Sequence, residues 1–210
     1  MDIHRTEEEQ VEAIKTWWKE NGTSVIVGVV LGIAVIFGVR YWFDYQKAQT
    51  QQASALYTQI LSSLVNNKEK AESLASDMAA NYSSTPYASL TALNLAKIKV
   101  DGKDYVGAQA YLQWILDNST DQGFQHVARI RLARLLLETN KLDDAEKLLK
   151  GIVAMGFSSE YAELRGDIFR LQGSQIQALE NYRLAQGDSQ PSSQRHQLLQ
   201  MKIDDLTVKK

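Results

Sequence analysis

The chain has 210 residues, a formal net charge of −2, three histidines and no cysteine. Its 23 basic and 25 acidic residues leave no basic excess, which argues against a nucleic-acid-binding protein. The lack of cysteine excludes a thiolate nucleophile and a cysteine-ligated metal site, and no common catalytic motif occurs, so we expect a non-catalytic protein with no cofactor and no metal.

Residues 1–20 are predicted to form a short amphipathic helix near a membrane surface. Val11, Ile14, Trp17 and Trp18 recur at helical spacing, and Asn21-Gly22 is predicted to end the helix. This helix either contacts a membrane partner or uses its two tryptophans to settle at the lipid interface. We favour the second interpretation.

Residues 21–42 are predicted to form a transmembrane helix. The run from Asn21 to Val39 carries no charge and, at about 1.5 Å per residue, nearly spans a hydrocarbon core of roughly 30 Å. Aromatic residues flank the run on both sides, as they do at membrane interfaces. A cleaved signal peptide and a buried core helix are the alternatives, but the acidic start and the apolar character on all sides argue against them.

Two further features of this segment bear on partners and sidedness. Gly28 and Gly32 have the spacing that lets another membrane helix approach closely, although glycine is common in such helices. Basic residues slightly favour a cytoplasmic N terminus, with three before the span (Arg5, Lys15 and Lys19) against two close behind it (Arg40 and Lys47).

Residues 43–207 are predicted to form an all-α domain of helical hairpins. Small residues recur at positions where two helices would cross, first at Ala96, Ala133 and Gly166, and again twelve residues later at Ala108, Ala145 and Ala178. Bulky residues follow four positions on, at Leu112, Leu149 and Tyr182. The spacing of 37 and then 33 residues resembles that of tetratricopeptide repeats.

We therefore expect a tetratricopeptide-like solenoid behind one transmembrane helix. Its repeats are predicted at about 53–83, 86–119, 123–156 and 158–187, and a helix over 191–207 is predicted to cap the stack. A solenoid offers a concave surface formed by the first helix of each pair. The candidate partner-binding residues on that surface are Asn94, Lys97, Arg131, Arg134, Asp167 and Arg170, and the alternative is that they form an ordinary solvated face.

Several stretches of the chain resemble one protein family. They are Gln10-Val11-Glu12-Ala13-Ile14, Glu20-Asn21-Gly22, Arg40-Tyr41-Trp42, Leu164-Arg165-Gly166 and Gln200-Met201-Lys202-Ile203. The similarity runs over the whole length and is to the YfgM-like ancillary subunits of the bacterial SecYEG translocon. It implies a single-pass protein of the bacterial inner membrane, with a cytoplasmic N terminus and a periplasmic repeat domain.

The resemblance also implies partners and a function. The partners are the SecYEG translocon, the periplasmic chaperone PpiD, nascent secretory chains and membrane lipid, and no nucleic acid. The function is a scaffold that links the translocon to periplasmic chaperones and assists the biogenesis of secretory or outer-membrane proteins. The alternative is a structural assembly factor for another envelope complex that does not contact translocating chains.

Overall fold

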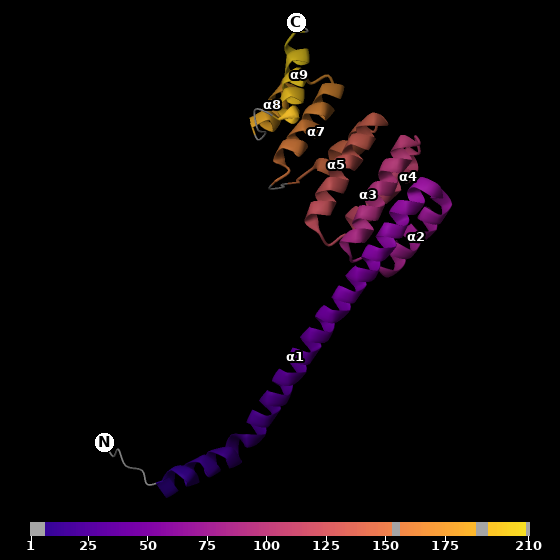
Figure 1. Cartoon of the computed structure of the whole chain (residues 1–210). Coiled ribbons are helices and arrows are strands. Elements are labelled where there is room, and N and C mark those ends of the chain that lie inside the picture. The colour runs from indigo at the N-terminus through magenta and orange to yellow at the C-terminus, as the bar shows by residue number, and fades with distance from the viewer. Residues whose placement is uncertain (1–6, 153–155, 188–192, 209–210) are drawn as a thin grey trace, which may run out of the picture. The chain divides into compact units, whose positions relative to one another are not determined.

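The computed structural model describes residues 7–152, 156–187 and 193–208, and within these ranges all regular structure is α-helical. The chain divides into two compact units, Met1–Gln51 and Gln52–Lys210. The predicted fold class, an apolar N-terminal helix followed by a helical repeat domain, is confirmed (Figure 1). The helices are α1 Glu7–Asn66, α2 Lys68–Asn81, α3 Pro86–Asp101, α4 Tyr105–Asn118, α5 Gln122–Glu138, α6 Leu142–Leu149, α7 Ser158–Leu171, α8 Gln175–Gly187 and α9 Gln194–Val208.

The predicted helix end at Asn21-Gly22 is wrong, because α1 continues through both residues. The side chain of Asn21 donates a hydrogen bond to the Trp17 carbonyl, and the indole of Trp18 lies over Gly22. A glycine inside a helix costs only about 1 kcal/mol, which the long apolar helix tolerates. Residues 7–20 of the first predicted segment and residues 21–42 are therefore parts of one helix, which extends past the predicted boundary at residue 42. Residues 1–6 lie outside the described ranges.

The apolar segment of α1, which is long enough to span a bilayer, is exposed in the structure. Within the described residues, α1 is the one helix long and apolar enough to cross a membrane, and only 6% of its most apolar window is buried. Large apolar side chains such as Leu31, Val35 and Phe37 are more than half exposed. Exposure of this kind contradicts the buried-core alternative, because a core helix buries its apolar surface.

Three hairpins of the second unit share the same turn. Each pair, α3–α4, α5–α6 and α7–α8, is joined by three residues, and the middle residue has a positive φ: 60° at Lys103, 58° at Asn140 and 78° at Gly173. In each turn the third residue donates its backbone N–H to a carbonyl five residues back, at 2.8 Å. The turns are 37 and 33 residues apart, the same spacing as the small residues at the predicted helix crossings.

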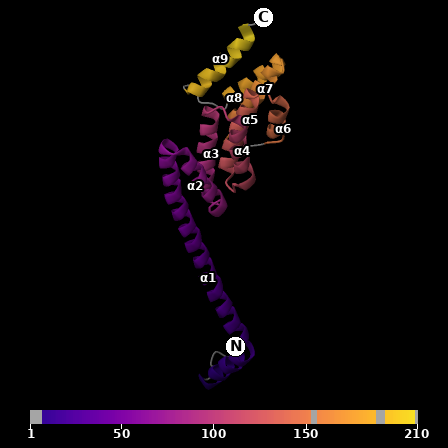
Figure 2. The same ribbon diagram turned by 90° about the vertical axis from the view of Figure 1, so that its right-hand side faces the viewer.

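The predicted crossing residues are buried where the paired helices pack. Each of the six small residues and three bulky residues that define the repeat is buried. The end of α1 and α2 are joined by a single extended residue, Asn67, in place of the three-residue turn, and side chains of both helices contribute to one buried cluster. Helices α2 to α9 then contact one another in chain order, and Figures 1 and 2 show them stacked one behind the next.

Two helix ends differ from the predicted repeat boundaries. α6 ends at Leu149, before the predicted boundary at 156, because Lys150 is extended and Gly151 has a φ of 71°, which glycine adopts without steric cost. Residues 153–155 lie outside the described ranges. The predicted capping helix over 191–207 corresponds to α9, which the structure describes from Gln194; Pro191 lies outside the described residues.

The close crossing at Ala145 yields a stability prediction. Ala145 is fully buried in the central core, so Ala145→Leu should lower the free energy of unfolding by about 1–3 kcal/mol because the added methyl groups force the helices apart. Lys97→Ala should change it by less than about 0.5 kcal/mol, because Lys97 is exposed. Urea unfolding followed by circular dichroism measures both, and equal shifts would contradict the crossing.

Candidate protein-interaction surface

Three of the six predicted partner-binding residues lie together in one groove. Lys97 on α3 and Arg131 and Arg134 on α5 line a groove of about 480 Å³ between α3, α4 and α5. We call this the cationic groove. Its other lining residues are Ala96, Val100, Tyr105, Leu112, Leu135 and Glu138.

The charges in the cationic groove are only partly compensated. Within the described part of the chain, neither Lys97 nor Arg131 has an acidic side chain within ion-pair distance, and the groove contains a single carboxylate, that of Glu138. Apolar side chains form much of the remaining lining. A surface with free cations beside exposed apolar groups suits a polypeptide segment that carries both carboxylates and apolar side chains.

The other three predicted residues lie outside the groove. The side-chain amide of Asn94 donates to the Tyr57 hydroxyl at 3.0 Å and to the Leu90 carbonyl at 2.9 Å, so it ties α3 to α1. Asp167 on α7 accepts hydrogen bonds within the domain, and Arg170 is exposed on the same helix. Asn94 and Asp167 are thus held by intramolecular partners, which the periodicity of the sequence does not reveal.

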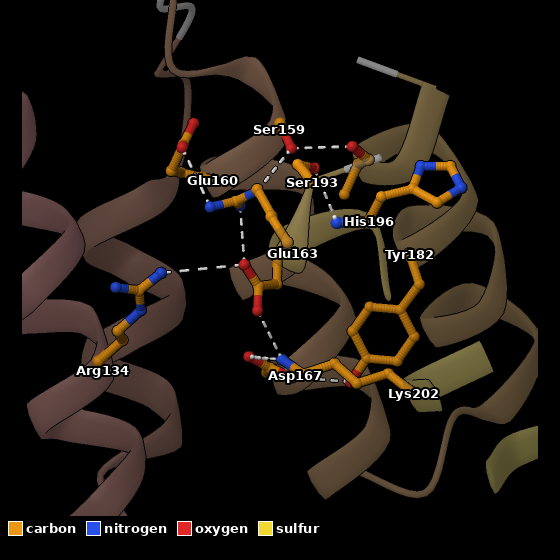
Figure 3. Close-up of polar contacts among 11 residues, drawn as sticks. Arg134, Ser159, Glu160, Glu163, Asp167, Tyr182, Ser193, His196 and Lys202 are labelled. Carbon is orange, nitrogen blue, oxygen red and sulfur yellow. Dashed lines mark hydrogen bonds and ion pairs between the residues drawn. The ribbon is translucent and has the colours of Figure 1, made fainter. Parts of the chain in front are cut away.

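Asp167 belongs to an ionic cluster between α7 and α9. Glu163 is almost fully buried, with a side chain 7% exposed, and accepts from Arg195 Nη2 at 2.7 Å. It also accepts from Lys202 Nζ at 2.8 Å (Figure 3). Lys202 Nζ also donates to Asp167 Oδ1 at 2.8 Å, and Arg195 pairs with Glu160 at 3.0 Å. We call these five residues the α7–α9 ionic cluster.

A buried tyrosine extends the ionic cluster into the core. Burial raises the pKa of the Tyr182 hydroxyl, and the nearby Asp167 carboxylate raises it further, because both disfavour the charged phenolate. The hydroxyl donates to Asp167 Oδ1 at 2.7 Å (Figure 3). The cluster thus joins the last repeat to α9.

Sequence reasoning missed Glu163, Arg195 and Lys202. One local signal was available: Glu163 and Asp167 are four residues apart on α7, and Arg195 and Lys202 are seven apart on α9, so each pair shares a helix face. No local sequence pattern indicates that the two faces meet, because the partners are more than 30 residues apart in the chain.

Arg134 lies next to both sites. It lines the cationic groove, and its Nη2 is 3.8 Å from Glu163 Oε2, although its side chain is 52% exposed (Figure 3). Because the Arg134 side chain is half exposed and the two atoms are 3.8 Å apart, this pair contributes little to stability. Arg134 therefore remains available to a ligand in the groove.

Gly28 and Gly32, the predicted membrane-helix contact, lie on α1 with open space beside them. A Cβ added at either position would meet no atom within 4 Å. Among the described residues, no group of three or more histidine, aspartate or glutamate side chains is arranged to hold a metal ion.

Known proteins match this chain over both α1 and the repeats. A family model described as a tetratricopeptide repeat-like domain matches residues 15–208. A relative from Escherichia coli named ancillary SecYEG translocon subunit is 32% identical over 99% of this chain and 100% of its own length. The chain belongs to the family of ancillary SecYEG translocon subunits.

Other members of the ancillary translocon subunit family match over similar lengths. The relative from Haemophilus influenzae is 30% identical over 95% of this chain and 97% of its own length, and that from Neisseria gonorrhoeae is 28% identical over 98% and 100%. No solved structure gives a significant match. The resemblance that the sequence motifs indicated is therefore confirmed, and the family match includes most of the apolar helix as well as the hairpins.

Proposed function

We propose that this chain is a membrane-anchored, non-catalytic scaffold that binds proteins at the Sec translocon. The observation that carries the proposal is the full-length similarity to relatives named ancillary SecYEG translocon subunit. The similarity extends over α1 and the repeats, so anchor and binding domain occur together in those relatives as they do here. The sequence supplies no cysteine and no common catalytic motif, which supports a binding function.

The anchor places the repeat domain at the bacterial inner membrane in this proposal. α1 crosses the bilayer once, the N terminus is cytoplasmic, and the repeat domain is periplasmic. The basic residues around the span support this orientation, with Arg5, Lys15 and Lys19 on the cytoplasmic side. Confinement beside a membrane partner raises the effective concentration to the millimolar range, so weak contacts in the periplasm suffice.

The cationic groove is the proposed site for a periplasmic partner. The proposed partners are the chaperone PpiD and translocating secretory chains, each through a segment that combines acidic and apolar residues. Lys97 and Arg131 have no acidic partner among the described residues, so binding of such a segment breaks no existing ion pair at these two positions. That advantage favours the groove over the α7–α9 ionic cluster, whose charges are already paired.

Charge reversal in the groove tests the proposal. The full chain, with a photocrosslinker at the exposed position Glu138, is expressed with a stalled secretory chain or with PpiD, and SecY copurification from mild detergent is measured in parallel. The double variant Lys97→Glu, Arg131→Glu should reduce crosslinking at Glu138 about tenfold, because attraction to an acidic segment becomes repulsion. Arg183→Glu, an exposed charge reversal on α8, should leave it unchanged.

The outcomes separate this function from the alternative. If SecY copurifies but the groove crosslinks to neither a translocating chain nor PpiD, the results favour a structural assembly factor. If SecY does not copurify with the unaltered chain, the proposal as a whole is overturned.

A further inference from the structure

The N-terminal part of α1 has an apolar face that no other described residue covers. Its large apolar side chains are between 49% and 67% exposed, and at 100° per residue they fall within an arc of about 120°. We call this face the N-terminal apolar arc, and it consists of Val11, Ile14, Trp17 and Trp18. The charged residues of the same stretch lie on the remaining circumference of the helix, and they are Glu9, Glu12, Lys15, Lys19 and Glu20. Residues 9–20 therefore form an amphipathic helix whose apolar face has no partner in the described structure.

α1 bends between this amphipathic stretch and the apolar run. In Figure 1 the dark N-terminal stretch of α1 runs in a different direction from the longer part of the helix. Asn21, Gly22 and Ser24 separate the arc from the apolar run, and glycine and serine are common where helices kink. Gly22 is buried under the indole of Trp18, and a Cβ there would lie 3.3 Å from two indole atoms. The amphipathic stretch therefore does not continue along the axis of the apolar run.

The surroundings of the N-terminal apolar arc favour lipid as its partner. The arc ends three residues before Asn21, where the uncharged run of the proposed membrane span begins, so lipid lies beside it whether or not a protein is bound. Tryptophan is enriched at the level of the lipid headgroups. The carboxylates of Glu9, Glu12 and Glu20 point away from the arc, so the arc can enter lipid without removing them from water.

We propose that residues 9–20 form a helix in the plane of the membrane, with the N-terminal apolar arc in the headgroup region and the charged face in water. Such a helix buries its apolar face by about 5–10 Å. If α1 instead left the bilayer along one straight axis, Val11 would lie about 15 Å beyond Asn21, in water. The inference rests on the proposed bilayer crossing of α1, but not on any partner of the repeat domain.

Spin labels measure the depth of each face. The chain has no native cysteine, so a nitroxide can be attached to one introduced cysteine at a time. Val11→Cys and Ile14→Cys place the label on the arc, Thr16→Cys places it on the opposite face, and Val35→Cys places it in the proposed span. The full chain is reconstituted alone in vesicles of phosphatidylethanolamine and phosphatidylglycerol. Power saturation with oxygen, which is enriched in lipid, and with a water-soluble nickel chelate then reports whether each label lies in lipid or in water.

The in-plane helix predicts a clear difference between the two faces. The ratio of oxygen to nickel accessibility should be several times higher at residues 11 and 14 than at residue 16, and highest at residue 35. Vesicles without phosphatidylglycerol should give the same order, because residues 9–20 carry three glutamates against two lysines and have no basic excess to attract anionic lipid.

Removal of the two tryptophans tests what holds the helix in the lipid. In the Ile14→Cys chain, Trp17→Ser combined with Trp18→Ser should lower the accessibility ratio to that of the residue 16 label, because the remaining apolar surface of the arc is small. Trp42→Ser, an exposed tryptophan at the other end of the span, is the matched control and should leave the ratio at residue 14 unchanged.

Three results would contradict the inference in different ways. Equal ratios at residues 14 and 16, with the residue 35 label in lipid, would reject the in-plane helix and leave the proposed span intact. A residue 35 label in water would reject the proposed span itself. If the labels at residues 11 and 14 lie in water in vesicles of the chain alone and lose accessibility to both reagents only after SecYEG is added, a protein and not lipid covers the arc.

Discussion

Replacing Gly166 with alanine should destabilise the repeat domain by about 1–3 kcal/mol, although the same change stabilises most helices. A Cβ at Gly166 would lie 2.6 Å from two ring carbons of Tyr182. The ring has no room to retreat, because Tyr182 is fully buried and its hydroxyl is bonded to Asp167. The melting temperature should fall by about 2–4 °C for each kcal/mol lost.

Two controls identify the cause of the Gly166 effect. Gly187→Ala, at the end of α8 with open space beside it, should be neutral or slightly stabilising. In a Tyr182→Leu background, Gly166→Ala should cost much less than in the native chain, since the clashing ring is absent. A destabilisation by Gly166→Ala of the same size in both backgrounds would show that the α7–α8 contact is not its source.

Glu163→Gln should lower the free energy of unfolding by about 3 kcal/mol, the lower end of the range for breaking a buried ion pair. The change removes the negative charge that Arg195 and Lys202 share, yet each cation keeps a second carboxylate, Glu160 or Asp167. Because each cation keeps one carboxylate partner, we expect the loss of free energy of unfolding to be at the lower end of that range. Urea unfolding of the detergent-solubilised full chain gives the free energy, and faster amide hydrogen exchange in α9 shows that this helix loosens first.

An exposed pair is the matched control for Glu163. Asp144 and Lys147 are 3.8 Å apart with side chains 60% and 78% exposed, so Asp144→Asn should change the free energy of unfolding by less than about 0.5 kcal/mol. Comparable effects of Glu163→Gln and Asp144→Asn would mean that the α7–α9 ionic cluster contributes no more than a surface pair.

The groove residues show how much of the candidate surface helical periodicity can place. Lys97, Arg131 and Arg134 were predicted on one surface, and the structure brings them to one groove. Asn94 and Asp167 were predicted on the same surface, but they lie outside the groove. Asn94 bonds to Tyr57, and Asp167 bonds to Tyr182 and Lys202. Helical periodicity places a residue on a face, but it does not say which distant side chain lies opposite.

The sequence alone determined the parts of this protein that depend on local pattern. An uncharged apolar run of membrane length, and small residues repeated at 37 and 33 residues, suffice to predict an apolar helix followed by hairpins, because helix formation and helix crossing depend on residues close in the chain. The continuous path of α1 through Asn21-Gly22 and the early end of α6 depend on contacts and dihedral angles that propensity does not fix.

Only the tertiary structure decided which polar groups are satisfied and which are free. Glu163 and Arg195 meet because α9 packs against the α7–α8 hairpin, and Asn94 meets Tyr57 because α3 lies beside the end of α1. Such pairings join residues far apart in sequence and depend on the relative position of whole helices. The identity of a single residue therefore does not predict which distant residue it pairs with.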